Sequence, residues 1–97
     1  MPGTDLIAAE RARQIAKEGW TSEHDDASRG GQLARAAVCY AMNRDQGCAE
    51  WPPDDWPWHV KFWKPCPGDR VRELVKAGAL IAAEIDRLQR QGGGERK

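Results

Sequence analysis

Residues 69–91 carry an apolar repeat that constrains the fold of this chain more than any other feature. Aliphatic side chains return at every third or fourth position, which is the period of one face of an α-helix. The repeat consists of Val71, Leu74, Val75, Gly78, Ile81, Ala82, Ile85 and Leu88. Asp69 precedes it, and aspartate is a preferred cap of helix amino termini. The sequence therefore predicts a long third helix that begins after Asp69.

Gly78 interrupts the aliphatic side chains of this predicted helix. A glycine inside a helix costs about 1 kcal/mol of stability relative to alanine. Close approach by a second helix is the usual compensation, because a residue without a Cβ leaves room for neighbouring atoms. We therefore predict that another helix crosses near Gly78.

A first helix is predicted from Thr4, which is its candidate cap, to Glu18, where Gly19 ends the pattern. Its residues divide between an apolar face and a polar face. The apolar face holds Ala8, Ala12, Ile15 and Ala16, and the polar face holds Glu10, Arg13, Gln14 and Lys17. An amphipathic helix of this kind lies on the surface of a domain.

A second helix is predicted over residues 32–42, which are apolar on nearly all sides apart from Arg35. A helix that is apolar all round is covered by other elements, so we expect this one to be central. The segment 20–31 before it is rich in residues that hydrogen-bond their own backbone. It is typical of a loop with at most one helical turn.

The segment from Asn43 to Pro67 holds four of the five tryptophans and five of the six prolines. Prolines at this density exclude a helix or a central strand and favour a connection that wraps around the helices. The tryptophans are Trp51, Trp56, Trp58 and Trp63. Their rings either fill the core that alanine-rich helices leave open or stack on a planar ligand, and both alternatives stay open at this point.

The expected architecture is all-α: a small domain of three helices with the tryptophan- and proline-rich loop wrapped across them. One domain, residues 1–91, suits a chain of 97 residues, and the glycine-rich polar tail 92–97 is expected to be disordered. The core of so short a chain is small, so we also expect a homo-oligomer.

Charge and cysteine content exclude several classes of protein. Fifteen basic residues balance fifteen acidic ones, so any site for a charged ligand must be local. Three cysteines without a paired spacing argue against a disulfide framework and a zinc site. No apolar run is long enough to span a bilayer and no secretion signal opens the chain, so the expected location is the cytoplasm.

Basic residues lie among and after the tryptophans. An indole ring can stack on a nucleobase, and lysine and arginine side chains bind phosphate. The candidate ligand-binding residues are Trp58, Trp63, Lys61, Lys64, Arg70, Arg72 and Lys76. The alternative is that these charges form a solvated face with small local ion pairs.

Carboxylates around the segment after the first helix are the candidate metal ligands. Magnesium prefers carboxylate oxygens, often together with the phosphates of a nucleotide. The candidate set is Glu10, Asp25, Asp26 and Glu84, since adjacent residues of one short loop cannot all face one ion. The alternative is that Asp25 and Asp26 only cap the next turn of helix. No motif typical of a catalytic nucleophile is present, and we assign no catalytic residue.

Several segments resemble a group of short, mostly uncharacterised helical proteins of phages and prophages. They read ERARQ (10–14), EGWTSEHDD (18–26), LARAAVCYA (33–41), WPW (56–58), WKP (63–65) and RELVKAGALIAAEIDRL (72–88). The chain is also similar, more weakly, to the all-α MazG-like nucleotide pyrophosphohydrolases, in which carboxylates on helices hold magnesium around a nucleoside triphosphate. The first resemblance implies a phage protein that acts inside a bacterial host cell, and the second implies Mg²⁺ as a cofactor.

Three functions follow as hypotheses. The leading one is a phage accessory protein that sequesters a nucleotide or a nucleotide-derived host signal without catalysis, as an anti-defence measure. The second is a divergent MazG-like, magnesium-dependent nucleoside triphosphate pyrophosphohydrolase that uses the four carboxylates. The third is a protein-binding inhibitor of a host defence nuclease, with the tryptophan loop as its contact surface.

Overall fold

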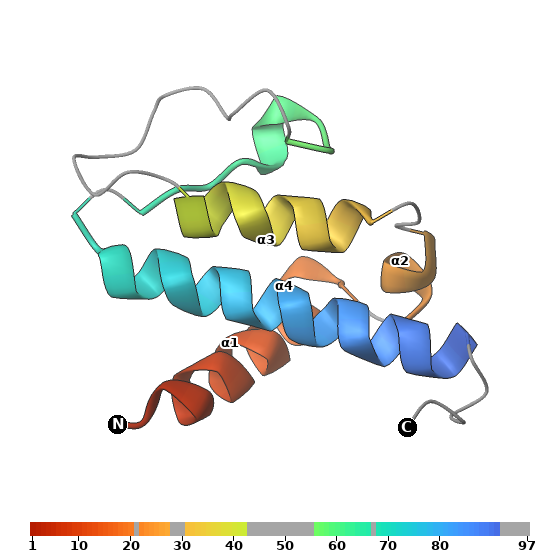
Figure 1. Ribbon diagram of the computed structural model, residues 1–97, viewed down its shortest axis with the longest axis horizontal. Coiled ribbons are helices and arrows are strands. Elements are labelled where there is room, and N and C mark those ends of the chain that lie inside the picture. Colours follow the sequence, from red (N-terminus) through yellow and green to blue (C-terminus); the bar gives the residue numbers. More distant parts are fainter. Residues whose placement is uncertain (21, 28–30, 43–55, 67, 92–97) are drawn as a thin grey trace.

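A computed structural model of the chain describes residues 1–20, 22–27, 31–42, 56–66 and 68–91. Within these ranges the protein is all-α and contains no strand, which confirms the predicted fold class. The elements in order are α1 (Gly3–Glu18), α2 (Ser22–Ala27), α3 (Gln32–Met42), the 3₁₀ turn η1 (Val60–Phe62) and α4 (Arg70–Gln91) (Figure 1). The predicted disordered tail 92–97 and Trp51 of the wrapped loop lie outside the described residues.

The helix ends follow the capping residues of the sequence, with one exception. The Asp69 carboxylate accepts the backbone N–H of Arg72 at 3.0 Å and so caps α4. Gly19 ends α1 in the left-handed conformation, with φ of 74°. The predicted cap Thr4 instead lies inside α1, whose N-cap is Pro2 and has no side-chain hydrogen bond. The fixed φ of a proline suits the start of a helix, so α1 begins without a capping side chain.

Helix α4 is the central helix of the fold, a place that we expected for residues 32–42. It packs against α3 and α1 and also contacts α2. Figure 1 shows it running between α3 and α1. Helix α3 packs against α4 and against the tryptophan-containing segment, which explains its apolar composition. Among the described helices, none is both long and apolar enough to cross a membrane.

The core lies between α3, α4 and the aromatic residues that follow α3. Its buried members are Leu33, Ala36, Ala37, Cys39, Tyr40, Trp56, Trp63, Ala77, Leu80 and Ala83. The Tyr40 ring stacks on Trp63 with 4.8 Å between centroids, and Trp56 meets both rings edge to face. Trp56 and Trp63 therefore fill the core, which is the first of the two roles that the sequence allowed for tryptophan.

Helix α1 lies on the surface as predicted, but its polar face points inward. Glu10 and Gln14 are each 2% exposed. Ala8 and Ala12 of the apolar face are exposed, and Ile15 is 42% exposed. Because a buried carboxylate is stable only when it is paired and hydrogen-bonded, this orientation needs cations at the α1–α4 contact.

The crossing of α1 and α4 occurs at Gly78, as the glycine predicted. A Cβ added to Gly78 would lie 2.5 Å from Cδ1 and 2.9 Å from Cγ1 of Ile7. These distances are shorter than any ordinary carbon–carbon contact. A glycine fits this position in the middle of α4 because the Ile7 side chain occupies the space that a Cβ methyl group would take.

A double-mutant cycle between these two residues tests the close approach. Gly78→Ala in an Ile7→Ala background should stabilise the protein by about 1 kcal/mol, because the helix propensity of alanine is then gained without overlap. In the unmodified background the overlap with Ile7 should cancel that gain or reverse its sign. Urea unfolding of the four proteins gives the coupling, and additive free energies of unfolding would contradict the close approach.

Candidate functional site

An aromatic cleft lies beside η1. It is lined by Trp20, Pro57, Trp58, His59 and Phe62 and has a volume of about 340 Å³. The Trp20 and Trp58 rings border it with 5.9 Å between centroids and an interplanar angle of 58°. Both tryptophans are half-buried, so part of each indole remains accessible. The cleft thus offers ring surface to a planar molecule.

Local hydrogen bonds hold the segment that carries this cleft. The His59 Nδ1 atom accepts the backbone N–H of Lys61 at 3.0 Å and caps η1. The indole N–H of Trp56 donates to the carbonyl of His59 at 3.2 Å. The backbone N–H of Lys64 donates to the Tyr40 hydroxyl at 3.0 Å. Burial raises the pKa of Tyr40 to about 12, so the tyrosine stays neutral and keeps this bond at physiological pH.

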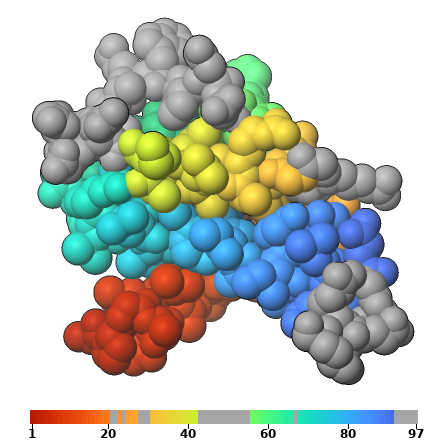
Figure 2. Space-filling view, viewed as in Figure 1, coloured from red at the N-terminus to blue at the C-terminus, as the bar shows by residue number. Residues whose placement is uncertain are grey.

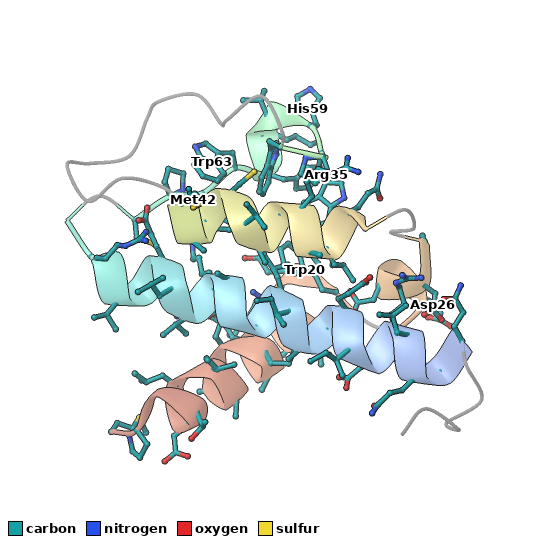
Figure 3. The ribbon with its side chains drawn as sticks, in the orientation of Figure 1. Trp20, Asp26, Arg35, Met42, His59 and Trp63 are labelled. Atoms are coloured by element: carbon teal, nitrogen blue, oxygen red, sulfur yellow. The ribbon has the colours of Figure 1, made fainter. Side chains whose placement is uncertain are left out.

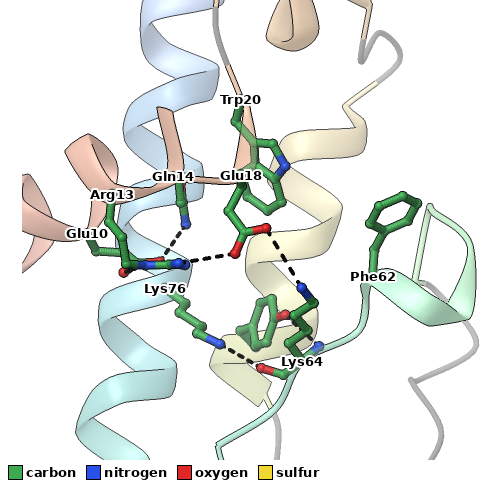
Figure 4. Close-up of a pocket in the computed structure, with 9 residues that line it drawn as sticks. Glu10, Arg13, Gln14, Glu18, Trp20, Phe62, Lys64 and Lys76 are labelled. Carbon is green, nitrogen blue, oxygen red and sulfur yellow. Dashed lines mark hydrogen bonds and ion pairs between the residues drawn. The ribbon is translucent and has the colours of Figure 1, made fainter. Parts of the chain in front are cut away.

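A smaller polar pocket of about 20 Å³ adjoins the cleft, and the two share Trp20 and Phe62 (Figure 4). Lys64 and Lys76 line this pocket. The Lys64 ammonium is 3.8 Å from a carboxylate oxygen of Glu18, and 58% of its side chain is exposed. The Lys76 ammonium donates to the carbonyl of Lys64 at 2.7 Å. Lys76 is thus held by the backbone, whereas the Lys64 side chain is largely exposed.

The floor of this region is an ionic cluster of Glu10, Arg13, Gln14, Glu18 and Arg72. Arg13 donates to both oxygens of Glu10 at 2.9 Å, and Arg72 lies 2.6 Å from one of them. Arg13 also donates to Glu18 at 3.1 Å. Burial raises the pKa of the Glu10 carboxyl, but the hydrogen bonds and charges of Arg13 and Arg72 outweigh burial, and the pKa falls below its ordinary value of 4.5.

The structure separates the predicted ligand-binding residues into two groups. Trp58 lines the cleft, the Lys61 ammonium lies 5.2 Å from the ring centre of Phe62, and Lys64 lines the adjoining polar pocket. Trp63 is 6% exposed and stacked on Tyr40, so its faces are covered. The remaining three cations hold the fold.

Arg70, Arg72 and Lys76 have structural partners. Arg70 donates to the carbonyls of Tyr40 and Ala41 at the end of α3. The last carbonyls of a helix have no partner within the helix, and Arg70 supplies one. Arg72 is paired with Glu10, and Lys76 holds the backbone at residue 64. None of the three is among the residues that line the aromatic cleft.

The four candidate metal ligands do not gather at one place. Each forms an ion pair with an arginine: Glu10 with Arg13 and Arg72, Asp25 with Arg11, Asp26 with Arg90, and Glu84 with Arg87. In the part of the chain that the structure describes, no group of three or more histidine, cysteine, aspartate or glutamate residues is placed to hold a metal ion. The carboxylates therefore act as partners of arginine in this fold.

Sequence reasoning missed Trp20 and Phe62 as members of the cleft. Trp20 directly follows the C-cap of α1 and is far from Trp58 in the chain, whereas Phe62 belongs to the same segment as Trp58 and ends η1. The only feature of the sequence that could have indicated their role is that each is a large aromatic side chain outside any apolar repeat. Arg35, the one charged residue of α3, was also unassigned, and Figure 3 draws it above α3 on the side where His59 lies.

Comparisons of the chain with protein-family models, with curated proteins and with solved structures find no match. The resemblances to phage proteins and to MazG-like enzymes therefore stay predictions.

Replacing Glu10 tests the ionic cluster. Glu10→Gln should destabilise the protein by about 2 kcal/mol at pH 7, because two guanidinium groups lose their shared charge partner. A carboxyl whose pKa is lowered by folding stabilises the folded state fully above its ordinary pKa of 4.5, and this contribution is lost as the pH falls through the lowered value. The difference between the two proteins in urea unfolding should thus shrink below pH 4.5.

Glu18→Gln is the matched control, because Glu18 pairs with the same Arg13 but is one-quarter exposed. It should cost less than about 1 kcal/mol. Equal losses for the two variants, or a Glu10→Gln loss that persists unchanged at acid pH, would contradict the assignment of Glu10 as the centre of the cluster.

Proposed function

We propose that the protein binds a planar aromatic anion, of the class of nucleotides and nucleotide-derived signals, in the aromatic cleft and does not transform it. The observation that supports this most is the cleft itself, with Trp20, Trp58 and Phe62 on its walls and a volume of about 340 Å³. Ligand sites in proteins commonly enclose about 300 to 1,000 Å³ and combine apolar walls with few polar groups.

Stacking supplies the affinity in this proposal. A nucleobase gains about 1 to 3 kcal/mol from stacking on an aromatic side chain, largely without regard to base identity. Trp58 carries this role because it is half-buried at the cleft, whereas the ring of Trp63 lies in the core. His59 adds a polar group at the same wall.

Lys61 and Lys64 supply the charge that selects an anion. Both side chains are exposed, and both flank Phe62, which lines the cleft. Two ammonium groups at the rim attract a phosphate of a ligand whose base lies between the rings. This local pair is consistent with a chain whose total charge is zero.

Binding without reaction is favoured over the pyrophosphohydrolase alternative. That alternative needs several carboxylates around Mg²⁺, and here each candidate carboxylate is paired with arginine. In a phage setting, which the sequence resemblance implies, capture without turnover would withdraw a host signal from the bacterial cytoplasm.

Calorimetric titration with adenine and guanine nucleotides, including cyclic nucleotides, tests this function. Trp58→Ala should weaken binding at least about tenfold, because one stacking surface is lost. Val60→Ala is the control, since Val60 belongs to the same segment but does not line the cleft. Lys64→Ala should weaken binding of phosphorylated ligands and leave nucleosides unaffected, with a smaller dependence on salt than in the wild type.

The titration, together with an assay of pyrophosphate release and a pull-down from host lysate, separates the three hypotheses. Absence of binding by every nucleotide, or equal affinity in wild type and Trp58→Ala, would refute the proposal. Release of pyrophosphate from a nucleoside triphosphate in the presence of Mg²⁺ would support the enzyme instead. A host protein that is captured by wild type and lost with Trp58→Ala, without nucleotide binding, would support the inhibitor.

A further inference from the structure

Helix α4 turns its most regular apolar stripe away from the core. Its large side chains are between 45% and 61% exposed. The stripe, named the α4 seam, consists of Val71, Leu74, Gly78, Ile81, Ile85 and Leu88. Figure 2 shows that α4 runs open between α3 and α1 on one face of the molecule. Within the described ranges, α3 and α1 cover the other two sides of α4 and leave the five large side chains of the seam exposed. Helix α1 reaches the seam at Gly78, through Ile7.

The spacing of the seam is that of a helix that packs along another helix. Successive members are three, four, three, four and three residues apart. Alternation of three and four gives an average of 3.5, which is the heptad period of helices that pair over their length. A helix that packs only on a domain core has a wider stripe with a period of 3.6.

The residues that flank the seam impose no charge barrier to such pairing. They are Arg70, Val75, Ala77, Ala82, Glu84, Gln89 and Gln91. Arg70 is hydrogen-bonded to the end of α3, and Glu84 is paired with Arg87 at 2.8 Å. The flanks are otherwise uncharged; Val75 and Ala77 are buried within the chain, and the partly exposed Ala82 is small enough to allow a second helix to approach.

We propose that a second copy of this chain covers the α4 seam, with the two α4 helices antiparallel. The intervals of the seam read the same in both directions, so a two-fold axis between Ala79 and Leu80 places every seam residue opposite another. A surface that is complementary to itself in this way is what a symmetric dimer requires. The inference depends on helix packing and is independent of the proposed ligand.

Antiparallel pairing also matches side-chain sizes across the axis. Val71 meets Leu88 of the second copy, and Leu74 meets its Ile85. Ile81 meets the layer of Gly78, where Ile7 of the same chain already takes the space of a methyl group. The antiparallel arrangement also aligns the helix dipoles favourably.

A groove beside the N-terminal end of the seam continues the docking surface. It lies between α1 and α4, has a volume of about 330 Å³ and takes its apolar lining from Leu6, Ala9, Val71 and Val75. In the antiparallel pair, Leu88 of the second copy lies next to Val71 and therefore at this groove. A large side chain in an apolar recess is a typical anchor of a protein interface.

The area of the seam is appropriate for a dimer. Five aliphatic side chains at about half exposure present on the order of 400 Å² of apolar surface, which is within the range of the largest patches that monomers expose. A stable interface buries about 800 Å² on each partner. The groove and the exposed flanking residues Gln89 and Gln91 add surface to that of the seam.

Sedimentation equilibrium of the purified protein tests this inference. Wild type should have twice the mass of one chain, and Ile81→Asp should raise the dimer dissociation constant at least about 100-fold, because each copy would bury a carboxylate at the axis. Val60→Asp introduces the same charge at an exposed apolar residue outside α4 and should leave the dimer intact. A monomeric wild type, a dimeric Ile81→Asp, or dissociation by both variants would overturn the proposal.

Cysteine cross-linking gives the orientation and does not depend on the folding of a charged variant. In a background in which Cys39, Cys48 and Cys66 are replaced, a mixture of Val71→Cys and Leu88→Cys chains should cross-link with a short bifunctional maleimide. Neither variant alone should do so, because equivalent residues lie at opposite ends of the paired helices. Cross-linking of Leu88→Cys chains to each other, or none in the mixture, would overturn the antiparallel pair.

Discussion

Burial of the Glu10 carboxylate between two guanidinium groups is the interaction on which the rest of this structure depends. The carboxylate has no exposed surface and is in contact with Arg13 of its own helix and Arg72 of α4. A charge in that position is tolerated only with such partners, because the cost of removing it from water is several kcal/mol. Any rotation of α1 that buried its alanines would separate Glu10 from Arg72. The pair therefore decides which side of α1 faces α4.

The exposed apolar surfaces are a consequence of that choice. Ile15 and the alanines of α1 point outward, since the charged face is held inside. The circumference of α4 is divided between α3, α1 and a third side that carries Leu74, Ile81 and Ile85. Most charged side chains of α1 and α4 are thus paired within the chain, whereas several large aliphatic side chains of the same helices remain exposed. The core that α3 and α4 form with three aromatic rings is small, as is expected for a short chain.

The positions of α1, α3 and α4 and several of their ends were predictable from the sequence, because they depend on local chemistry, whereas the six-residue helix α2 lies in a segment that we expected to be a loop. Gly19 and Asp69 mark ends through backbone conformation and capping, which act within a few residues. The orientation of α1 was not predictable, since its hydrophobic pattern shows that a face exists but not what covers it. Glu10 and Arg72 are far apart in the chain, and no periodicity reports their contact. The same reason hid the cleft, which joins Trp20 to Trp58.

A continuous series of ion pairs joins the two surfaces to which the proposals refer. Arg72 beside the groove contacts Glu10, which contacts Arg13. Arg13 contacts Glu18, and Glu18 lies 3.8 Å from Lys64 of the polar pocket that adjoins the aromatic cleft. The seam and the cleft share no residue. Glu10 is shared by Arg13 and Arg72, and Glu18 is shared by Arg13 and Lys64. The α1–α4 contact next to Val71 and the small polar pocket therefore belong to one ionic network, in which each charged group has its position fixed by more than one partner.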